Sequence, residues 1–186
     1  VSQRKGELIQ MSPSTSGYTK LEFSITSRGL IGCRSTLMTL TKGNAVVNSS
    51  FAGYCPMKGK MSRRTRGSLI AWENGTATSY GLFNAQERGT LFIGAGVPVY
   101  EGMIVGVNPK PEDITVNVCK KKHITNTRAS GSDDALKLTP PTVMSLEQCL
   151  EFIADDELVE VTPKTIRMRK RILSKEQRMK QAFRNK

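Results

Sequence analysis

The apolar residues of this chain occur in short segments in which they alternate with polar residues. Residues 20–26 show the pattern most clearly, because Leu21, Phe23 and Ile25 alternate with polar side chains. This alternation is typical of a strand in an antiparallel sheet with one covered face. Glycine and proline separate the segments, with 16 and eight residues in the chain. The sequence therefore predicts many short strands joined by turns.

The first 52 residues predict part of a ferredoxin-like domain. Strands are expected at 7–11, 20–26 and 45–51, with a helix at 30–41 that carries Leu30, Cys33, Leu37 and Leu40 near one face. The order strand, strand, helix, strand is four-sixths of a βαββαβ unit. The first strand and helix of that unit are expected to lie before Val1.

Residues 53–186 predict a β-barrel-like domain with decorating helices, so that the whole chain is of the α+β class. Short strands are expected near 69–72, 90–93, 97–107 and 114–119, with a helix near 78–88. Ser145 and Gln148 have the spacing of a capping box at the start of a second helix, and Ser174 and Gln177 repeat it. Between these two helices, a strand carries Ile166 and Met168 on one side and arginines on the other.

Charge is distributed unevenly along the chain. The net charge is +12, from 28 basic and 16 acidic residues. Residues 133–160 hold eight acidic residues and one lysine, which leaves 27 basic and eight acidic residues elsewhere. The electrostatic potential of such an excess of positive charge favours a polyanion such as RNA, because each phosphate that is neutralised releases counterions. No apolar run approaches the length of a membrane span.

Neither a metal centre nor a catalytic site is predicted. The four cysteines are far apart and His123 is the single histidine, whereas zinc needs closely spaced ligand pairs. Four reduced thiols are expected, with Cys33 and Cys149 in the core. The phosphate-binding pattern GxxxxGK[ST] is also absent. His123 lies in a lysine run, which favours a phosphate contact over acid–base catalysis.

Three basic groups are the candidate RNA contacts. The first lies on a loop rich in Gly, Ser and Thr that could follow an irregular phosphate path, the second lies between the two expected domains, and the third follows one strand. They comprise Lys120, Lys121, Lys122, His123, Asn126 and Arg128; Lys58, Lys60, Arg63, Arg64 and Arg66; and Arg167, Arg169, Lys170 and Arg171.

The acidic segment 133–160 offers a second interpretation of the chain. It would then be a protein-interaction module that binds a basic partner, with the basic surface only adding solubility. Asp155, Asp156 and Glu157 could bind Mg²⁺, a basic partner, or basic loops of the same protein. Salt separates the two interpretations, because RNA binding weakens steeply with ionic strength and an apolar protein contact does not.

Several long blocks of the chain resemble the BipA/TypA family of translational GTPases. The early part, residues 32–43, is also similar to the second helix of the fifth domain of elongation factor G. Cys33 stands where members of the BipA/TypA family usually have an aromatic residue, and this difference implies a small repacking of the helix. The blocks are residues 27–32, 86–89, 99–106, 123–131, 146–148, 155–163 and 166–167.

The resemblance implies a parent of five domains, of which residues 1–52 are the remainder of the fifth domain and residues 53–186 the family-specific C-terminal domain. GTP and Mg²⁺ would bind in an N-terminal GTPase domain outside this chain, and no cofactor is expected within it. The implied partners are the ribosome, namely large-subunit rRNA, ribosomal proteins and the acceptor arm of an A-site tRNA. The family is associated with large-subunit assembly and stress adaptation. A monomer is expected, located in the bacterial cytoplasm or, alternatively, in a plastid.

Overall fold

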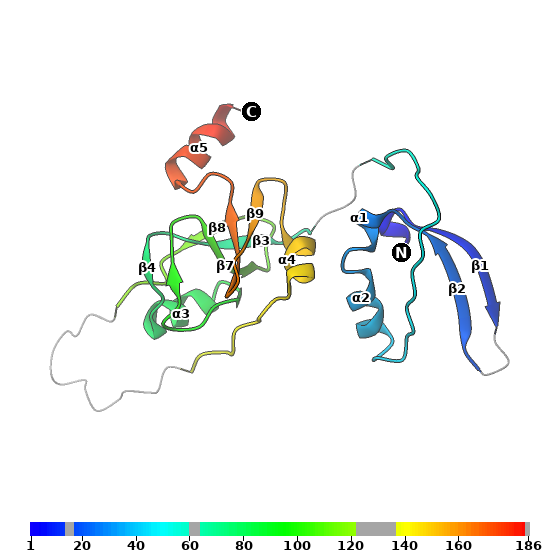
Figure 1. Cartoon of the computed structure of the whole chain (residues 1–186). Helices are drawn as coiled ribbons and strands as arrows, with labels where there is room; N and C mark the ends of the chain where they lie inside the picture. Colours follow the sequence, from blue (N-terminus) through cyan, green and yellow to red (C-terminus); the bar gives the residue numbers. More distant parts are fainter. Residues whose placement is uncertain (14–16, 60–63, 122–136, 185–186) are drawn as a thin grey trace. The chain divides into compact units, whose positions relative to one another are not determined.

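The computed structural model describes residues 1–13, 17–59, 64–121 and 137–184. The chain divides into two compact units, a first unit of Val1–Arg63 and a second unit of Arg64–Lys186 (Figure 1). The boundary expected from the sequence, between residues 52 and 53, lies earlier in the chain, within a stretch that has no regular secondary structure.

The first unit is a hairpin followed by two short helices. A turn of 3-10 helix, η1 (Ser2–Arg4), precedes the antiparallel strands β1 (Glu7–Pro13) and β2 (Thr19–Ser24). Leu8 pairs with Phe23 and Met11 with Leu21. The register shifts between Leu8 and Gln10, which places residues 8 and 11 on one face of the hairpin. Helices α1 (Ser27–Leu30) and α2 (Cys33–Leu40) follow. The two expected strands are confirmed.

Two predictions for the first unit are wrong. The helix expected over 30–41 is broken at Ile31 and Gly32, because Gly32 adopts the left-handed region at φ 71°. The strand expected at 45–51 is absent, and residues 44–59 form no regular secondary structure. Ala45 and Val47 are half-buried and alternate with exposed neighbours, so the period of two persists. No described strand pairs with this segment, and a strand needs such a partner for its backbone hydrogen bonds.

The second unit is built on an open, mostly antiparallel sheet. Its strands lie in the order β8–β3–β7–β10–β9, and β5 also pairs with β7. Only β3 and β8 pair in parallel, whereas β4 and β6 form a separate ribbon. The β-rich class is confirmed, but the described strands do not close into a barrel, because β8 and β9 remain at opposite edges. The bounds are β3 (Gly67–Ala71), β4 (Gly75–Thr76), β5 (Thr90–Leu91), β6 (Pro98–Val99), β7 (Met103–Asn108), β8 (Ile114–Val116), β9 (Glu157–Val161) and β10 (Ile166–Lys170).

Helices cover both faces of this sheet. On β7, Met103 and Val105 contribute to a large cluster that includes residues of α3 (Ser79–Gln86). Ile104 points the other way, into a smaller cluster that includes residues of α4 (Leu146–Phe152). Because successive side chains of a strand point to opposite faces of the sheet, β7 contributes to both core clusters. Helix α5 (Lys175–Arg184) follows β10 and has no buried residue (Figure 1).

Local signals in the sequence explain where several elements begin. Ser145 and Gln148 form the expected capping box, with Ser145 N donating to Gln148 Oε1 at 2.8 Å. Helix α3 begins after Thr78, whose hydroxyl accepts from Gly81 N at 3.0 Å. The strand expected at 97–107 is interrupted at residues 100–102 and becomes β6 and β7.

Cys33 and Cys149 are buried, as expected for core cysteines. None of the helices in the described ranges is long and apolar enough to cross a membrane.

Candidate nucleic-acid interface

The first group of candidate contacts begins at a well-anchored point. Val118, two residues before the lysine run, is 1% exposed and belongs to the large core cluster. Lys120 and Lys121 then lie on the surface. The buried Val118 therefore fixes the position at which the backbone that carries Lys120 and Lys121 reaches the surface of the second unit. The other expected contacts of this group, Lys122, His123, Asn126 and Arg128, lie outside the described residues.

The arginines of β10 lie on the side of the strand opposite Met168, as the alternation predicts. Arg169 Nε is 2.6 Å from Glu160 Oε1, and Arg167 pairs with Glu160 in the strand register. Glu160 therefore interrupts the basic stripe and partly neutralises it. Arg167 is half-buried and Arg171 is exposed. Arg171 also donates to the Asp155 carbonyl oxygen at 3.2 Å.

Glu160 also binds the half-buried phenol of Tyr100. The Tyr100 hydroxyl donates to Glu160 Oε2 at 2.6 Å. Burial, together with this hydrogen bond and the carboxylate charge, raises the pKa of Tyr100 well above its ordinary value. Glu160 therefore links β9 to Arg169 on one side and to the residue after β6 on the other.

Lys170 does not lie on the proposed RNA surface. Its side chain is 2% exposed, and its ammonium lies 2.5 Å from Asp113, 2.8 Å from Asp156 and 2.9 Å from Glu157. Burial alone lowers the pKa of Lys170, but hydrogen bonds to the three carboxylates outweigh it and raise the pKa above its ordinary value. We therefore withdraw Lys170 from the expected RNA contacts, because its charge is already satisfied inside the protein. Its place on the Met168 side of the strand was the sequence signal for burial.

Arg64 is withdrawn from the expected contacts for the same reason. Its NH2 group lies 2.5 Å from Glu157 Oε1 and 2.9 Å from Ser68 Oγ. Its guanidinium carbon also lies 3.9 Å from the centre of the Phe152 ring, an attractive cation–π geometry. Arg64 thus fastens the first residue of the second unit to β3, α4 and β9.

The remaining members of the group between the two units differ in their surroundings. Lys58 is half-buried and forms an ion pair of 2.7 Å with Glu7 in the first unit. Arg66 is exposed and lies immediately before β3. Lys60 and Arg63 lie outside the described residues.

Three acidic residues at the end of the segment 133–160 form ion pairs within the chain. Asp156 and Glu157 pair with Lys170, Glu157 also pairs with Arg64, and Glu160 pairs with Arg169. Of the three alternatives expected for Asp155–Glu157, these contacts agree with docking against basic residues of the same protein for Asp156 and Glu157. Within the ranges that the structure describes, no group of three or more His, Cys, Asp or Glu is arranged to hold a metal ion.

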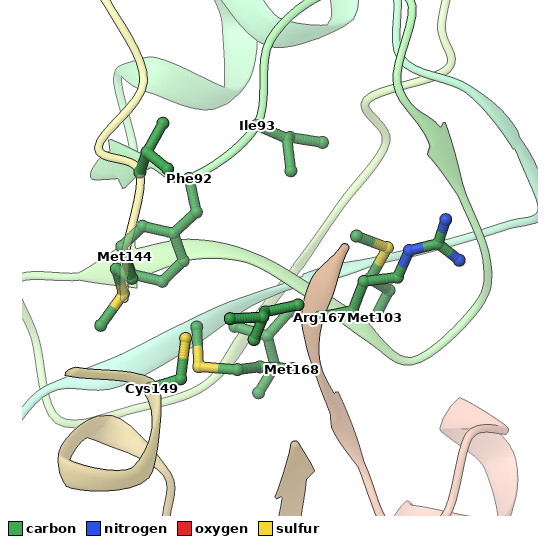
Figure 2. Close-up of a pocket in the computed structure, with 10 residues that line it drawn as sticks. Phe92, Ile93, Met103, Met144, Cys149, Arg167 and Met168 are labelled. Atoms are coloured by element: carbon green, nitrogen blue, oxygen red, sulfur yellow. The ribbon is translucent and has the colours of Figure 1, made fainter. Parts of the chain in front are cut away.

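A small hollow lies on the α4 side of the sheet. It has a volume of about 90 Å³ and is lined mainly by apolar side chains, among them Phe92, Met144, Cys149 and Met168. Figure 2 shows the sulfur atoms of Met144, Cys149 and Met168 close together, with the Arg167 guanidinium pointing away from them. Arg167 is the one charged residue among the described residues that line the hollow. The lining therefore provides no pair of groups for acid–base or nucleophilic chemistry.

The two units match two different family models. The model for the elongation factor G C-terminus matches residues 1–65, and the model for the TypA/BipA C-terminal domain matches residues 66–175. The order of these two matches defines the chain as a region of a protein related to the translation factors.

Relatives of known name agree over nearly the whole chain. It is 49% identical over 179 residues to a protein of Salmonella typhimurium, 50% over 176 residues to one of Haemophilus influenzae and 46% over 170 residues to one of Synechocystis. Each of these proteins is named large ribosomal subunit assembly factor BipA. The alignments cover 96%, 94% and 91% of this chain, but 30%, 29% and 28% of the relatives. The chain belongs to the BipA/TypA family and corresponds to less than a third of the length of these relatives.

Proposed function

We propose that this chain is the RNA-facing region of a ribosome-associated GTPase and holds that protein on the ribosome by charge and shape. The observation that carries the proposal is the division of charge. The acidic residues Asp156, Glu157 and Glu160 are paired inside the second unit, whereas Lys120 and Lys121 lie on its surface. The basic excess is therefore available to phosphates. The assembly-factor names of the relatives agree with a ribosomal partner.

The lysine run and its continuation are the primary contact in this proposal. Lys120 and Lys121, with Lys122, His123, Asn126 and Arg128, bind the acceptor arm of an A-site tRNA or the rRNA beside it. The arginines of β10 and Arg171 form a second contact, which Glu160 weakens at Arg169. Lys58, Lys60, Arg63 and Arg66 form a third and weaker contact.

The wider role of the parent protein is part of the same proposal. GTP hydrolysis with Mg²⁺ takes place in a domain outside this chain, and the chain itself performs no chemistry. The parent acts as a monomer on the large subunit, in its assembly and under stress, in the bacterial cytoplasm. The protein-interaction alternative is less well supported, because three of the eight acidic residues of the segment 133–160, namely Asp156, Glu157 and Glu160, already pair with Lys170, Arg64 and Arg169.

The test replaces Lys120, Lys121 and Lys122 with alanine and measures binding to purified bacterial 70S ribosomes at several salt concentrations. We expect weaker binding, with the slope of log affinity against log salt reduced by roughly 0.7 to 0.9 for each phosphate contact that is lost.

The matched control removes the same charge elsewhere, by replacing Lys42, Lys110 and Lys164, which are all exposed. This variant should retain most of the affinity. If both variants bind equally, or if the salt slope of the first is unchanged, the lysine run is not the contact. Binding that barely responds to salt in the unaltered chain would favour the protein-interaction alternative.

A further inference from the structure

Two ion pairs between β9 and β10 differ in how far they face the solvent. The side chains of Lys170 and Glu157 are 2% and 0% exposed, whereas those of Arg169 and Glu160 are 25% and 36% exposed. The buried pair is part of the interior of the second unit. The pair of Arg169 and Glu160 lies at the surface, within reach of a phosphate, and belongs to the basic stripe of β10.

Glu160 lies among the arginines of this stripe. In the strand register it is opposite Arg167, and Leu158, two residues before it, is opposite Arg169. Glu160 therefore faces Arg167 directly and Arg169 diagonally across the two strands. Its Oε1 lies 2.6 Å from Arg169 Nε, and Arg169 Nη1 donates to the Lys170 carbonyl oxygen at 3.2 Å. Two nitrogens of the Arg169 guanidinium are thus already engaged by oxygen atoms of the protein.

The other oxygen of the same carboxylate is bound by Tyr100. Its hydroxyl donates to Glu160 Oε2 at 2.6 Å, and Tyr100 packs against the large core cluster. The phenol is therefore attached to a well-packed part of the second unit. A carboxylate that is bound at both oxygens by two different residues is not free to swing into the solvent. Tyr100 thus holds Glu160 beside Arg169.

A carboxylate in this position occupies the guanidinium as a phosphate would, because arginine donates hydrogen bonds to both kinds of anion. A phosphate that binds Arg169 must displace Glu160, and it is also repelled by the negative charge of Glu160. A flexible RNA strand that offers single phosphates therefore gains little at this point. Phosphates that other contacts already hold near Arg167 or Arg171 do not need to displace the carboxylate.

We propose that Glu160 is a specificity-determining residue and that Tyr100 positions it: the carboxylate occupies Arg169 and prevents the stripe of β10 from binding RNA phosphates indiscriminately. The inference rests on the proposed function and deepens it. It adds that an acidic residue within the basic surface selects against unstructured RNA, which is specificity through a repulsive element.

The test is Glu160→Gln in the full 186-residue chain, with binding to single-stranded poly(U) RNA and to purified bacterial 70S ribosomes as the two measurements. Glutamine keeps the shape of the side chain and removes its charge. We expect the affinity for poly(U) to rise roughly three- to tenfold, the effect of about one hydrogen bond. The slope of log affinity against log salt should steepen by about 0.7, the value for one more phosphate contact on a single strand. The affinity for ribosomes should change less than about twofold.

Glu87→Gln is the matched control. Glu87 is exposed in the second unit, so its replacement removes the same charge from a position outside the stripe. This variant should bind poly(U) within about twofold of the unaltered chain. If both variants gain equally, net charge explains the effect and the inference is overturned.

A double-mutant cycle shows whether the effect passes through Arg169. Glu160→Gln is combined with Arg169→Ala, and its gain in poly(U) affinity should shrink to less than about twofold in that background. A gain of the same size in both backgrounds would contradict the inference. The cycle also excludes a gain that arises from loosened folding, because such a gain would not depend on Arg169.

The role of Tyr100 has its own variant. Tyr100→Phe removes only the hydroxyl, so Glu160 stays charged but is no longer held, and we expect a smaller gain in poly(U) affinity, roughly two- to threefold. Tyr80→Phe removes the hydroxyl of another half-buried tyrosine and should leave the affinity unchanged. If these two variants bind poly(U) equally, Tyr100 does not position Glu160 and that part of the inference is wrong.

Ribosome binding in the same series separates the inference from the proposed function. If Glu160→Gln raises the affinity for ribosomes as much as that for poly(U), Glu160 does not discriminate and the inference is overturned. If the unaltered chain binds ribosomes with a steep salt dependence but Glu160→Gln leaves poly(U) binding unchanged, the inference fails while the proposed function stands. If the unaltered chain does not bind ribosomes even at low salt, the proposed function fails first and the inference fails with it.

Discussion

The two units bury their apolar side chains to very different extents. Among the described residues, sixteen apolar side chains are buried, and Cys33 is the only one of them in the first unit. The hairpin of the first unit leaves Leu8 53%, Met11 65% and Leu21 51% exposed, although these residues share one face. The second unit instead has a core on each face of its sheet. Burial of apolar surface is the main stabilising contribution in folding, so the two units should differ sharply in stability.

Amide hydrogen exchange of the intact chain should reveal the largest difference. We expect the amides of β7 to exchange at least about a hundredfold more slowly than those of β1 and β2, because β7 lies inside the sheet and contributes to both cores. Mass spectrometry of peptides from the two units provides the measurement. Equal protection of the two regions would contradict the comparison and would mean that the first unit is stabilised by something other than its own burial.

The buried charge cluster should account for the next largest effect. Lys170→Met removes the cation that three carboxylates surround, and leaves Glu157, which is fully buried, without one of its two cations. We expect the second unit to lose about 3 to 5 kcal/mol of unfolding free energy. Urea denaturation followed by circular dichroism at neutral pH measures the loss. Lys121→Met removes an exposed lysine and should change the unfolding free energy by less than about 0.5 kcal/mol.

The pH dependence provides an independent check on the same cluster. Because the pKa of Lys170 is raised in the folded state, its stabilising contribution is complete below the unfolded-state pKa of about 10.4. The contribution is lost as pH rises through the folded-state pKa. The difference in stability between the unaltered chain and Lys170→Met should therefore be constant from pH 7 to pH 9 and shrink at strongly alkaline pH. A difference that grows with pH would show that the cluster has been misassigned.

Replacing one leucine in each unit with alanine tests the difference in burial between the two units at single side chains. Leu69 is 0% exposed and Leu8 is 53% exposed. Leu69→Ala should cost about 2 to 5 kcal/mol, because it leaves a cavity in a packed core. Leu8→Ala should cost less than about 0.5 kcal/mol. Thermal unfolding of the two variants measures both values, and a cost for Leu8→Ala that approached that of Leu69→Ala would show that the hairpin face is covered in solution.

Periodicity in the sequence predicted the local elements well where their signals were complete. The alternation at Leu21, Phe23 and Ile25 located β2, and the capping box of Ser145 and Gln148 located α4. The strand expected at 45–51 was wrong, because a strand also needs a neighbour, and pairing depends on parts of the chain distant in sequence. The described strands do not close into the expected barrel for the same reason, because the spacing of strands along the sequence does not determine whether a sheet closes.

The charged residues of the candidate site could be predicted from the sequence, but the contacts that their side chains and backbone make could not. The exposed Lys120 and Lys121 follow from composition, and the inward position of Lys170 follows from strand alternation. That Asp113 would meet Lys170, 57 positions away, could not be read from the sequence. The hydrogen bond from Thr78 to the Lys120 carbonyl oxygen could not be predicted either, because uncharged side chains that bind backbone give no compositional signal. Contacts of this kind are therefore harder to predict than the charges themselves.

The place of β10 in the sheet has a consequence for how the protein is made. This strand is the last in sequence among the described residues, yet it lies between β7 and β9. While the polypeptide is being synthesised, the edge of β7 at Met103 and Ile104, which β5 does not cover, stays open for as long as the stretch containing β10 has not emerged. Unpaired edges of this kind attract other chains. During synthesis, this part of the sheet is therefore prone to pair with other chains until β10 is inserted between β7 and β9.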